Sequence, residues 1–125
     1  MGLLDKVPKR LPVVGGVYWL SRDYYDPSDQ ADHPQLVISL DRVRRVAITV
    51  SRTSKEHAAG RMGVSHPKDD ELGLSMNGWW RLHRPHRVPF SAFDDEEVEM
   101  LGRLDEGSMV KVQDVLAPKG PEVGS

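Results

Sequence analysis

Short runs of alternating hydrophobic and polar residues recur through the first four fifths of the chain, and this two-residue period is typical of β-strands. The clearest run begins at Arg45, where Val46, Ile48 and Val50 alternate with smaller or polar residues. Nine prolines and eleven glycines divide the chain into short pieces, which favours short strands over long helices. The pattern predicts strands over residues 16–21, 35–40, 45–51, 61–66 and 78–83, with polar loops over residues 26–34, 52–60 and 68–77.

The last quarter of the chain changes to a helical period. Met109, Val112 and Leu116 recur at helical spacing after Asp105, a residue type that caps helix N-termini, and Pro118 ends the pattern. The pattern predicts a helix over residues 105–117. Residues 94–101 fit either a short helix capped by Asp94 or the beginning of a last strand over residues 97–103. Short strands followed by one amphipathic helix predict a mainly β fold, a small and partly open barrel with a C-terminal helix.

The composition fits one folded domain. The 125 residues include 38 % hydrophobic and 29 % charged residues, and no cysteine, which excludes disulfides and thiolate metal sites. No apolar run approaches the ~18 residues of a membrane span, and the N-terminus lacks the features of a secretory signal. We therefore expect a cytoplasmic protein without a membrane segment, with a basic arm at residues 1–12, a barrel domain at 13–117 and a flexible tail at 118–125.

Charge is segregated along the chain although the net charge is only −2. Residues 42–61 hold six basic residues against one acid, whereas residues 94–106 hold seven acids against one arginine. The segment 79–87 (WWRLHRPHR) adds arginines and histidines beside two tryptophans. A basic segment next to an aromatic residue suits single-stranded nucleic acid, and the alternative is an ordinary solvated face. His83 and His86 are three residues apart without a nearby carboxylate in the sequence, so we expect no metal site and no cofactor.

Three segments, in order, resemble the MazF/PemK family of growth-inhibiting toxins over roughly residues 16–117. The first is Gly16-Val17-Tyr18-Trp19 with His33-Pro34-Gln35-Leu36-Val37-Ile38-Ser39, and the second is the strand ending in Thr53-Ser54-Lys55. The third is Leu101-Gly102-Arg103-Leu104-Asp105-Glu106 with the helix that follows it, and Arg87-Val88-Pro89 lies between the second and third at the place of a further family motif. The resemblance implies an SH3-like barrel of the MazF/PemK/CcdB type, a homodimer and an antitoxin partner.

The resemblance also implies an activity, the metal-independent cleavage of single-stranded RNA. In this reaction the ribose 2′-hydroxyl attacks its own phosphate, which requires a proton acceptor, a proton donor for the leaving oxygen and donors aimed at the phosphorane. The family's threonine matches Thr53, with Ser54 beside it, but His33 stands at the place of the family's arginine. An imidazole with a pKa of about 6.5 is a suitable acid or base at neutral pH.

The candidate catalytic residues are therefore His33, Thr53 and Ser54, with Arg52 or Arg87 as a stabiliser of the phosphorane. The candidate RNA-binding residues share a positive charge or an aromatic ring and are Arg44, Arg45, Arg52, Lys55, Arg61, Trp79, Arg81 and Arg87.

Two other functions remain open because the arginine is replaced. The first is a catalytically inactive barrel that binds a protein, either an inhibited host enzyme, as in gyrase inhibitors of this architecture, or an antitoxin. The second is a nucleic-acid-binding module that does not cleave. At the level of single residues, His33 could equally be an exposed loop histidine, and the hydroxyl of Thr53 could satisfy a turn of the backbone.

Overall fold

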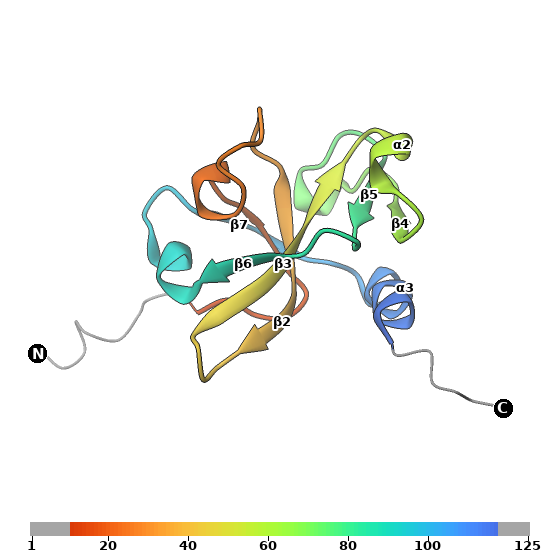
Figure 1. Ribbon diagram of the computed structural model, residues 1–125. Coiled ribbons are helices and arrows are strands. Elements are labelled where there is room, and N and C mark those ends of the chain that lie inside the picture. The colour runs from red at the N-terminus through yellow and green to blue at the C-terminus, as the bar shows by residue number, and fades with distance from the viewer. Residues whose placement is uncertain (1–10, 118–125) are drawn as a thin grey trace, which may run out of the picture.

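The computed structural model describes residues 11–117, and the predictions for the N-terminal arm at residues 1–10, the tail at 118–125 and Pro118 lie outside the described residues. Seven short strands and a C-terminal helix make up most of the described chain (Figure 1). The strands are β1 (Gly16–Trp19), β2 (Pro34–Asp41), β3 (Val46–Thr53), β4 (Gly63–His66), β5 (Gly78–Arg81), β6 (His86–Pro89) and β7 (Glu99–Arg103). The helices are α2 (Glu56–Ala59), α3 (Glu106–Leu116) and the 3₁₀ helices η1 (Arg22–Tyr24), η2 (Asp70–Leu72) and η3 (Phe90–Asp94).

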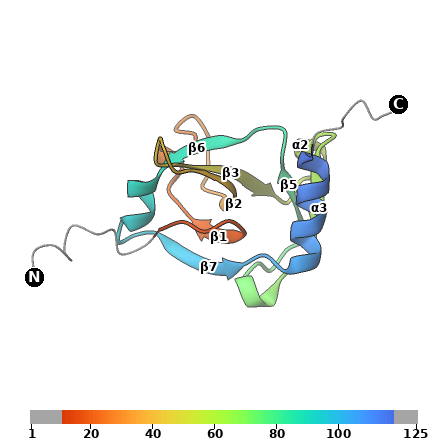
Figure 2. The same ribbon diagram turned by 90° about the horizontal axis from the view of Figure 1, so that it is seen from below.

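The strands form an antiparallel sheet in the order β4-β5-β3-β2-β1-β7, with β6 also paired to β3. The long strand β3 lies at its centre: its first half pairs with β6, its last two residues pair with β5, and β2 runs along its other edge. Seen from below, the sheet curves so that β7 and β6 lie on opposite sides of β3 (Figure 2). The prediction of a mainly β, small barrel-like fold with a C-terminal helix is confirmed.

The two faces of the sheet cover two separate hydrophobic clusters, because successive side chains of a strand point to opposite faces. One cluster includes Leu36, Val50 and Trp80, together with Val112 of α3. The other cluster includes Val37 of β2, Ala47 of β3 and Phe93 of η3. Residues of β2 and β3 contribute to both clusters, so the central strands are buried on both sides along much of their length.

Helix α3 forms as predicted because its cap and its apolar stripe agree. The Asp105 carboxylate accepts a hydrogen bond from the backbone N–H of Ser108 at 2.9 Å, which satisfies one of the free donors of the first turn. Val112 is fully buried, and Met109 and Val115 pack against the same cluster. No helix within residues 11–117 is long and apolar enough to cross a membrane.

The boundaries of several elements differ from those predicted. Strand β3 continues to Thr53 rather than ending at Ser51, and the loop after it contains the short helix α2. Strand β6 was not predicted, because a four-residue segment with one buried apolar side chain, Val88, carries almost no periodic signal. Of the two alternatives for residues 94–101, the last strand is confirmed as β7, whereas Asp94 ends η3 and does not cap a helix.

Candidate functional site

A stripe of hydroxyl-bearing residues runs along one face of β3. Thr49, Ser51 and Thr53 are two residues apart and therefore share a face of the strand. All three are buried, with exposed fractions of 0 %, 2 % and 7 %. We call the part of the sheet that carries these residues and their cross-strand neighbours the polar face.

Gln35 holds the middle of the polar face together. Its side-chain amide donates hydrogen bonds to Ser51 Oγ at 2.7 Å and to the carbonyl oxygen of His33 at 3.2 Å. Its amide oxygen accepts a hydrogen bond from Thr49 Oγ1 at 2.7 Å. Because Gln35 is completely buried, these bonds stabilise one orientation of its side chain and tie β2 to β3.

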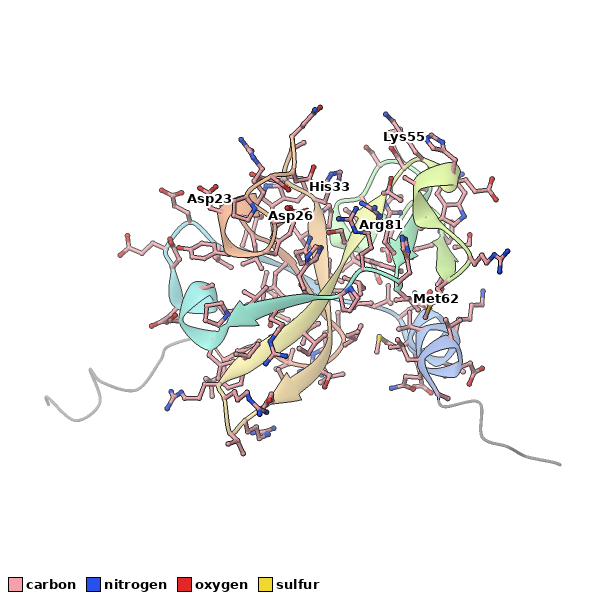
Figure 3. All side chains as sticks on the ribbon, in the orientation of Figure 1. Asp23, Asp26, His33, Lys55, Met62 and Arg81 are labelled. Carbon is pink, nitrogen blue, oxygen red and sulfur yellow. The ribbon has the colours of Figure 1, made fainter. Side chains whose placement is uncertain are left out.

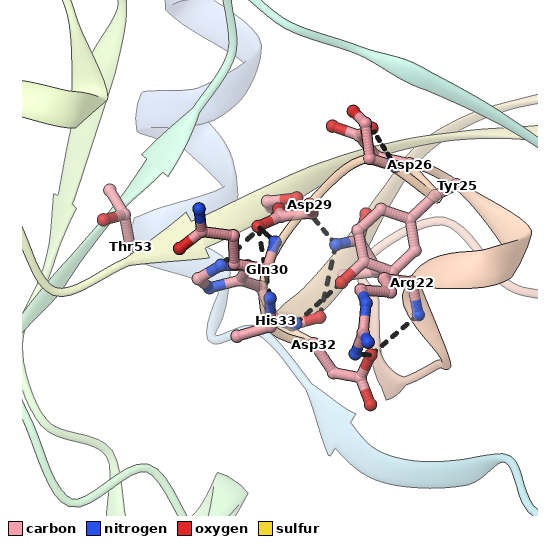
Figure 4. A network of polar contacts seen from close by, with 12 residues as sticks. Arg22, Tyr25, Asp26, Asp29, Gln30, Asp32, His33 and Thr53 are labelled. Carbon is pink, nitrogen blue, oxygen red and sulfur yellow. Dashed lines mark hydrogen bonds and ion pairs between the residues drawn. The ribbon is translucent and has the colours of Figure 1, made fainter.

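His33 and Thr53 lie near the same end of the two central strands. Gln35 and Ser51 are the last pair of the β2–β3 register at this end of the sheet, and His33 and Thr53 lie two residues beyond them, His33 just before β2 and Thr53 as the last residue of β3. The backbone N–H of His33 donates to the Tyr25 hydroxyl at 2.7 Å, and its Nε2 lies 3.6 Å from the carboxylate of Asp29. Figure 4 shows Thr53 beyond His33 and the acidic loop at residues 26–32 around the imidazole. The predicted histidine and threonine thus lie at the same end of the β2–β3 pair, and their joint role in catalysis stays a prediction.

Ser54 and His33 line the same surface groove, which has a volume of about 290 Å³. The groove also contains Trp19 and Met76, which are exposed by 41 % and 61 % although both are apolar. Thr53 lies at the end of β3 beside this groove, and its Oγ1 accepts a hydrogen bond from the backbone N–H of Lys55 at 3.1 Å. His33 and Ser54 thus share the groove with Arg52, whereas Thr53 is not among the residues that line it.

Trp79 and Arg81 of β5 extend the polar face on the other side of β3. Trp79 pairs with Thr53, and Arg81, two residues further along β5, points to the same face as Trp79 and pairs with Gly63 of β4. Both side chains are half-buried. Arg81 Nε is shielded from solvent and has no hydrogen-bond acceptor among the described residues. Figure 3 shows Arg81 and His33 near the same half of β3.

His86 is a further member of the polar face that the sequence did not single out as catalytic. It pairs with Thr49, and its Nε2 lies 3.4 Å from Ser51 Oγ. Its ring lies 5.2 Å from the ring of Tyr25. Burial lowers the pKa of His86 below its ordinary value of 6.5, and burial raises the pKa of the Tyr25 phenol to about 12. Nothing in the sequence shows that β6 pairs with β3, so this histidine could not be placed beside Ser51.

Arg52 forms several hydrogen bonds inside the protein. It points to the opposite face from Thr53 and is 6 % exposed. Its guanidinium donates from Nε to His66 Nδ1 at 3.0 Å and from Nη2 to the carbonyl oxygens of His66 and Met76, both at 2.8 Å. Burial lowers the pKa of this guanidinium below its ordinary value. This arginine thus links β3 to the loop before β5 and also lines the groove that contains His33 and Ser54, and its role in RNA binding stays a prediction.

The other predicted RNA-binding residues are spread over three places. Arg44 and Arg45 lie in the β2–β3 turn, and since Thr53 is at the far end of the eight-residue strand they are about 20 Å or more from it. Arg87 pairs with Ile48 and points away from the polar face, so the structure does not support it as the stabiliser of the phosphorane. Lys55 and Arg61 are exposed on either side of α2.

Three side chains lie at the spacing of metal ligands, but the histidine among them already uses both ring nitrogens in hydrogen bonds within the protein. One ligand atom each of His66, Asp69 and Asp105 lies within 4.8 Å of the others. His66 Nδ1 accepts the hydrogen bond from Arg52, so the ring proton is on Nε2, which donates to Asp69 at 3.1 Å. Both ring nitrogens are thus engaged, and the group ties β4 to η2 and α3.

Comparison with known proteins finds similarity at the level of three-dimensional structure. No protein-family model matches the chain, and no curated protein matches its sequence. Crystal structures of MazF (Form-I) and MazE-MazF (Form-III) from Deinococcus radiodurans are similar to it, with TM-scores of 0.63 and 0.59 and sequence identities of 20 % and 19 %. Each alignment covers 86 % of this chain and 94 % of the other. Identities this low establish a shared architecture, and the chain therefore has a MazF-like fold.

Proposed function

We propose that this protein is a metal-independent endoribonuclease that cleaves single-stranded RNA. The observation that carries the proposal is the open groove that His33 and Ser54 line together, at the end of the sheet where His33 precedes β2 and Thr53 ends β3. An imidazole is able to transfer protons at neutral pH, and a hydroxyl is able to donate a hydrogen bond to a phosphate oxygen. The MazF-like architecture supports the same reaction, because the family resemblance matches Thr53 to the family's threonine and His33 to the place of its arginine.

The reaction needs only groups that this face supplies. The 2′-hydroxyl oxygen of a ribose attacks the adjacent phosphorus, a new O2′–P bond forms, and the bond from phosphorus to the 5′-oxygen breaks. The 2′-proton passes to a base, and the leaving 5′-oxygen takes a proton from an acid, so the products are a cyclic phosphate and a free 5′-hydroxyl. His33 is one proton-transfer group, and the hydroxyls of Thr53 and Ser54 are donors to the phosphate.

Cleavage of a single-stranded RNA in the presence of EDTA tests the proposal. We expect fragments with cyclic-phosphate ends, and we expect His33→Ala and Thr53→Ala to lower the rate at least about 100-fold, the usual contribution of a proton-transfer group. His57→Ala is the matched control, because His57 is an exposed histidine on α2. RNA that stays intact, or variants that cleave as fast as the parent, would contradict the proposal.

A second candidate function is binding of a protein partner in the groove. Trp19 and Met76 expose apolar surface there, which is unusual for side chains of this size unless a partner covers them. Several of the similar structures are of MazE-MazF, so an antitoxin chain is a partner class that we propose for this groove.

Growth of cells that express the chain separates the two candidates. We expect growth arrest that Thr53→Ala relieves if the activity is cleavage. Arrest that survives Thr53→Ala but disappears with Trp19→Ala would instead favour inhibition of a bound protein. A homodimer, expected from the family resemblance, stays a prediction that sedimentation equilibrium can check.

A further inference from the structure

A second imidazole lies on the polar face, across the Asp29 carboxylate from the first. Asp29 Oδ2 is 3.6 Å from His33 Nε2, and the same carboxylate acts electrostatically on His86. Tyr25 connects the two histidines as well, because its hydroxyl accepts from the backbone of His33 while its ring packs on His86. The two imidazoles therefore border the same part of the surface.

The hydrogen bonds of the polar face leave the Ser51 hydroxyl able to donate to His86, and in that arrangement His86 Nε2 carries a lone pair. Gln35 donates to Ser51 Oγ, so the proton of the Ser51 hydroxyl is free to point at His86 Nε2, 3.4 Å away. His86 Nε2 is then an acceptor, and the ring is neutral with its proton on Nδ1. The contact with Ser51 is long for a hydrogen bond, so a substrate hydroxyl is able to replace it.

Arg81 places a positive charge beside His86. Its charge acts on the imidazole electrostatically, and its shielded Nε lacks an acceptor among the described residues. The shielded Nε is itself out of reach of a ligand, but the side chain is only half-buried, so we expect the rest of the guanidinium to donate to a phosphate oxygen. Arg81 thus provides the guanidinium that the start of β2 lacks, where His33 stands.

From this geometry we infer that His86 is the second proton-transfer residue of the proposed ribonuclease and that Arg81 binds the scissile phosphate next to it. His86 Nε2 takes the proton of the attacking 2′-hydroxyl, and the protonated ring of His33 gives its proton to the leaving 5′-oxygen. Arg81 donates hydrogen bonds to the phosphorane oxygens while the O2′–P bond forms and the P–O5′ bond breaks. The inference rests on the proposed function. In this mechanism two histidines transfer the protons, where the family resemblance implies an arginine.

The charges that face His86 are consistent with a neutral ring. Burial has the largest effect on its pKa and lowers it; Asp26 and Asp29 raise it, and Arg81 and Arg84 lower it. Across β3 the ring meets the uncharged side chains of Thr49 and Ser51, and on the loop side it meets the ring of Tyr25. A base must be deprotonated to work, so the rate is expected to rise with pH through the lowered pKa of His86.

The experiment measures cleavage rate against pH for the parent and for His86→Gln, with His83→Gln as the matched control. His83 is exposed and three residues away, so we expect its variant to cleave within about twofold of the parent. We expect His86→Gln to lower kcat at least about 100-fold and to remove the acidic limb of the profile. Affinity for a 2′-O-methyl RNA, which binds without being cleaved, should stay within about threefold for His86→Gln and fall for Arg81→Gln.

The outcomes separate the inference from the proposed function. A parent that cleaves, with a His86→Gln variant that cleaves within about fivefold and keeps the acidic limb, would overturn the inference and leave the ribonuclease standing. A parent that yields no cyclic-phosphate ends would overturn both. The His86→Asn variant repeats the measurement if circular dichroism shows that the glutamine variant is misfolded, and the same two results decide the question.

Discussion

Arg52 is a charged side chain whose hydrogen bonds are almost all made inside the protein. The carbonyl oxygens of His66 and Met76 and the ring nitrogen of His66 depend on it for their donors. A buried acceptor that loses its donor costs about 1–3 kcal/mol. The guanidinium therefore holds together β3, the end of β4 and the loop before β5, which is the wall of the groove next to Ser54.

Replacing this side chain is expected to destabilise the protein. Arg52→Met leaves several buried acceptors without a donor, so we expect the free energy of unfolding to fall by about 3 kcal/mol. Urea unfolding measures the change. Arg44→Met is the control, because Arg44 is exposed in the β2–β3 turn and pairs only with Asp41, and we expect a change below about 0.5 kcal/mol. Equal stabilities for the two variants would contradict the structural role of Arg52.

At the scale of single elements, the cap of α3 is a local feature with a measurable contribution. The Asp105 carboxylate accepts from the backbone N–H of Ser108 at 2.9 Å and from its hydroxyl at 2.8 Å, and these bonds lower the pKa of Asp105. We expect Asp105→Ala to reduce the free energy of unfolding by about 1 kcal/mol, and Asp105→Asn to cost less because its amide oxygen still accepts. Denaturant melts of both variants check this, and a fully tolerated alanine would show that the cap contributes nothing.

The sequence predicts those elements whose signal is local. The alternation in β3 and the cap of α3 each depend on residues that are close together in the sequence, and both elements are present in the structure. Strand β6 has no such signal, because its pairing with β3 depends on a contact some forty residues away in the chain. The same reason hides His86, whose neighbour Ser51 is 35 residues away. His33 and Thr53 could be paired only through the family resemblance, and Arg52 could be seen as basic but not as buried.

The molecule as a whole has two sets of groups that make its stability depend on pH. Burial lowers the pKa of His66 and of His86, so both prefer to be neutral in the folded protein. Hydrogen bonds lower the pKa of several aspartates, including Asp26 and Asp105. In the unfolded chain the pKa of a histidine is about 6.5 and that of an aspartate is about 3.8. Because folding lowers both values, each set of groups stabilises the folded protein at pH values above its unfolded pKa, and this stability is lost as the pH falls.

We therefore expect stability to fall in two steps as the pH is lowered. In the first step, the unfolded chain takes up protons on the histidines before the folded protein does, so the urea midpoint should be lower at pH 5.5 than at pH 7.5. His66→Gln should show a smaller difference between these two conditions, whereas His57→Gln, changed at an exposed position, should behave like the parent. The second step should follow below about pH 4. A midpoint independent of pH between 7.5 and 5.5 would contradict the burial of these rings.

Strand β3 serves two purposes at once, because Thr49, Ser51 and Thr53 carry the polar face while Val50, which points to the other face, packs in the cluster that contains Val112 of α3. Deleting or inserting one residue within the strand would exchange the two sets, placing apolar side chains where RNA is proposed to bind and hydroxyls in the helix-side interior. Changes of chain length during evolution are therefore confined to the loops. Individual side chains remain free to be replaced, and this freedom allows a histidine to take an arginine's place while the frame of the strand is preserved.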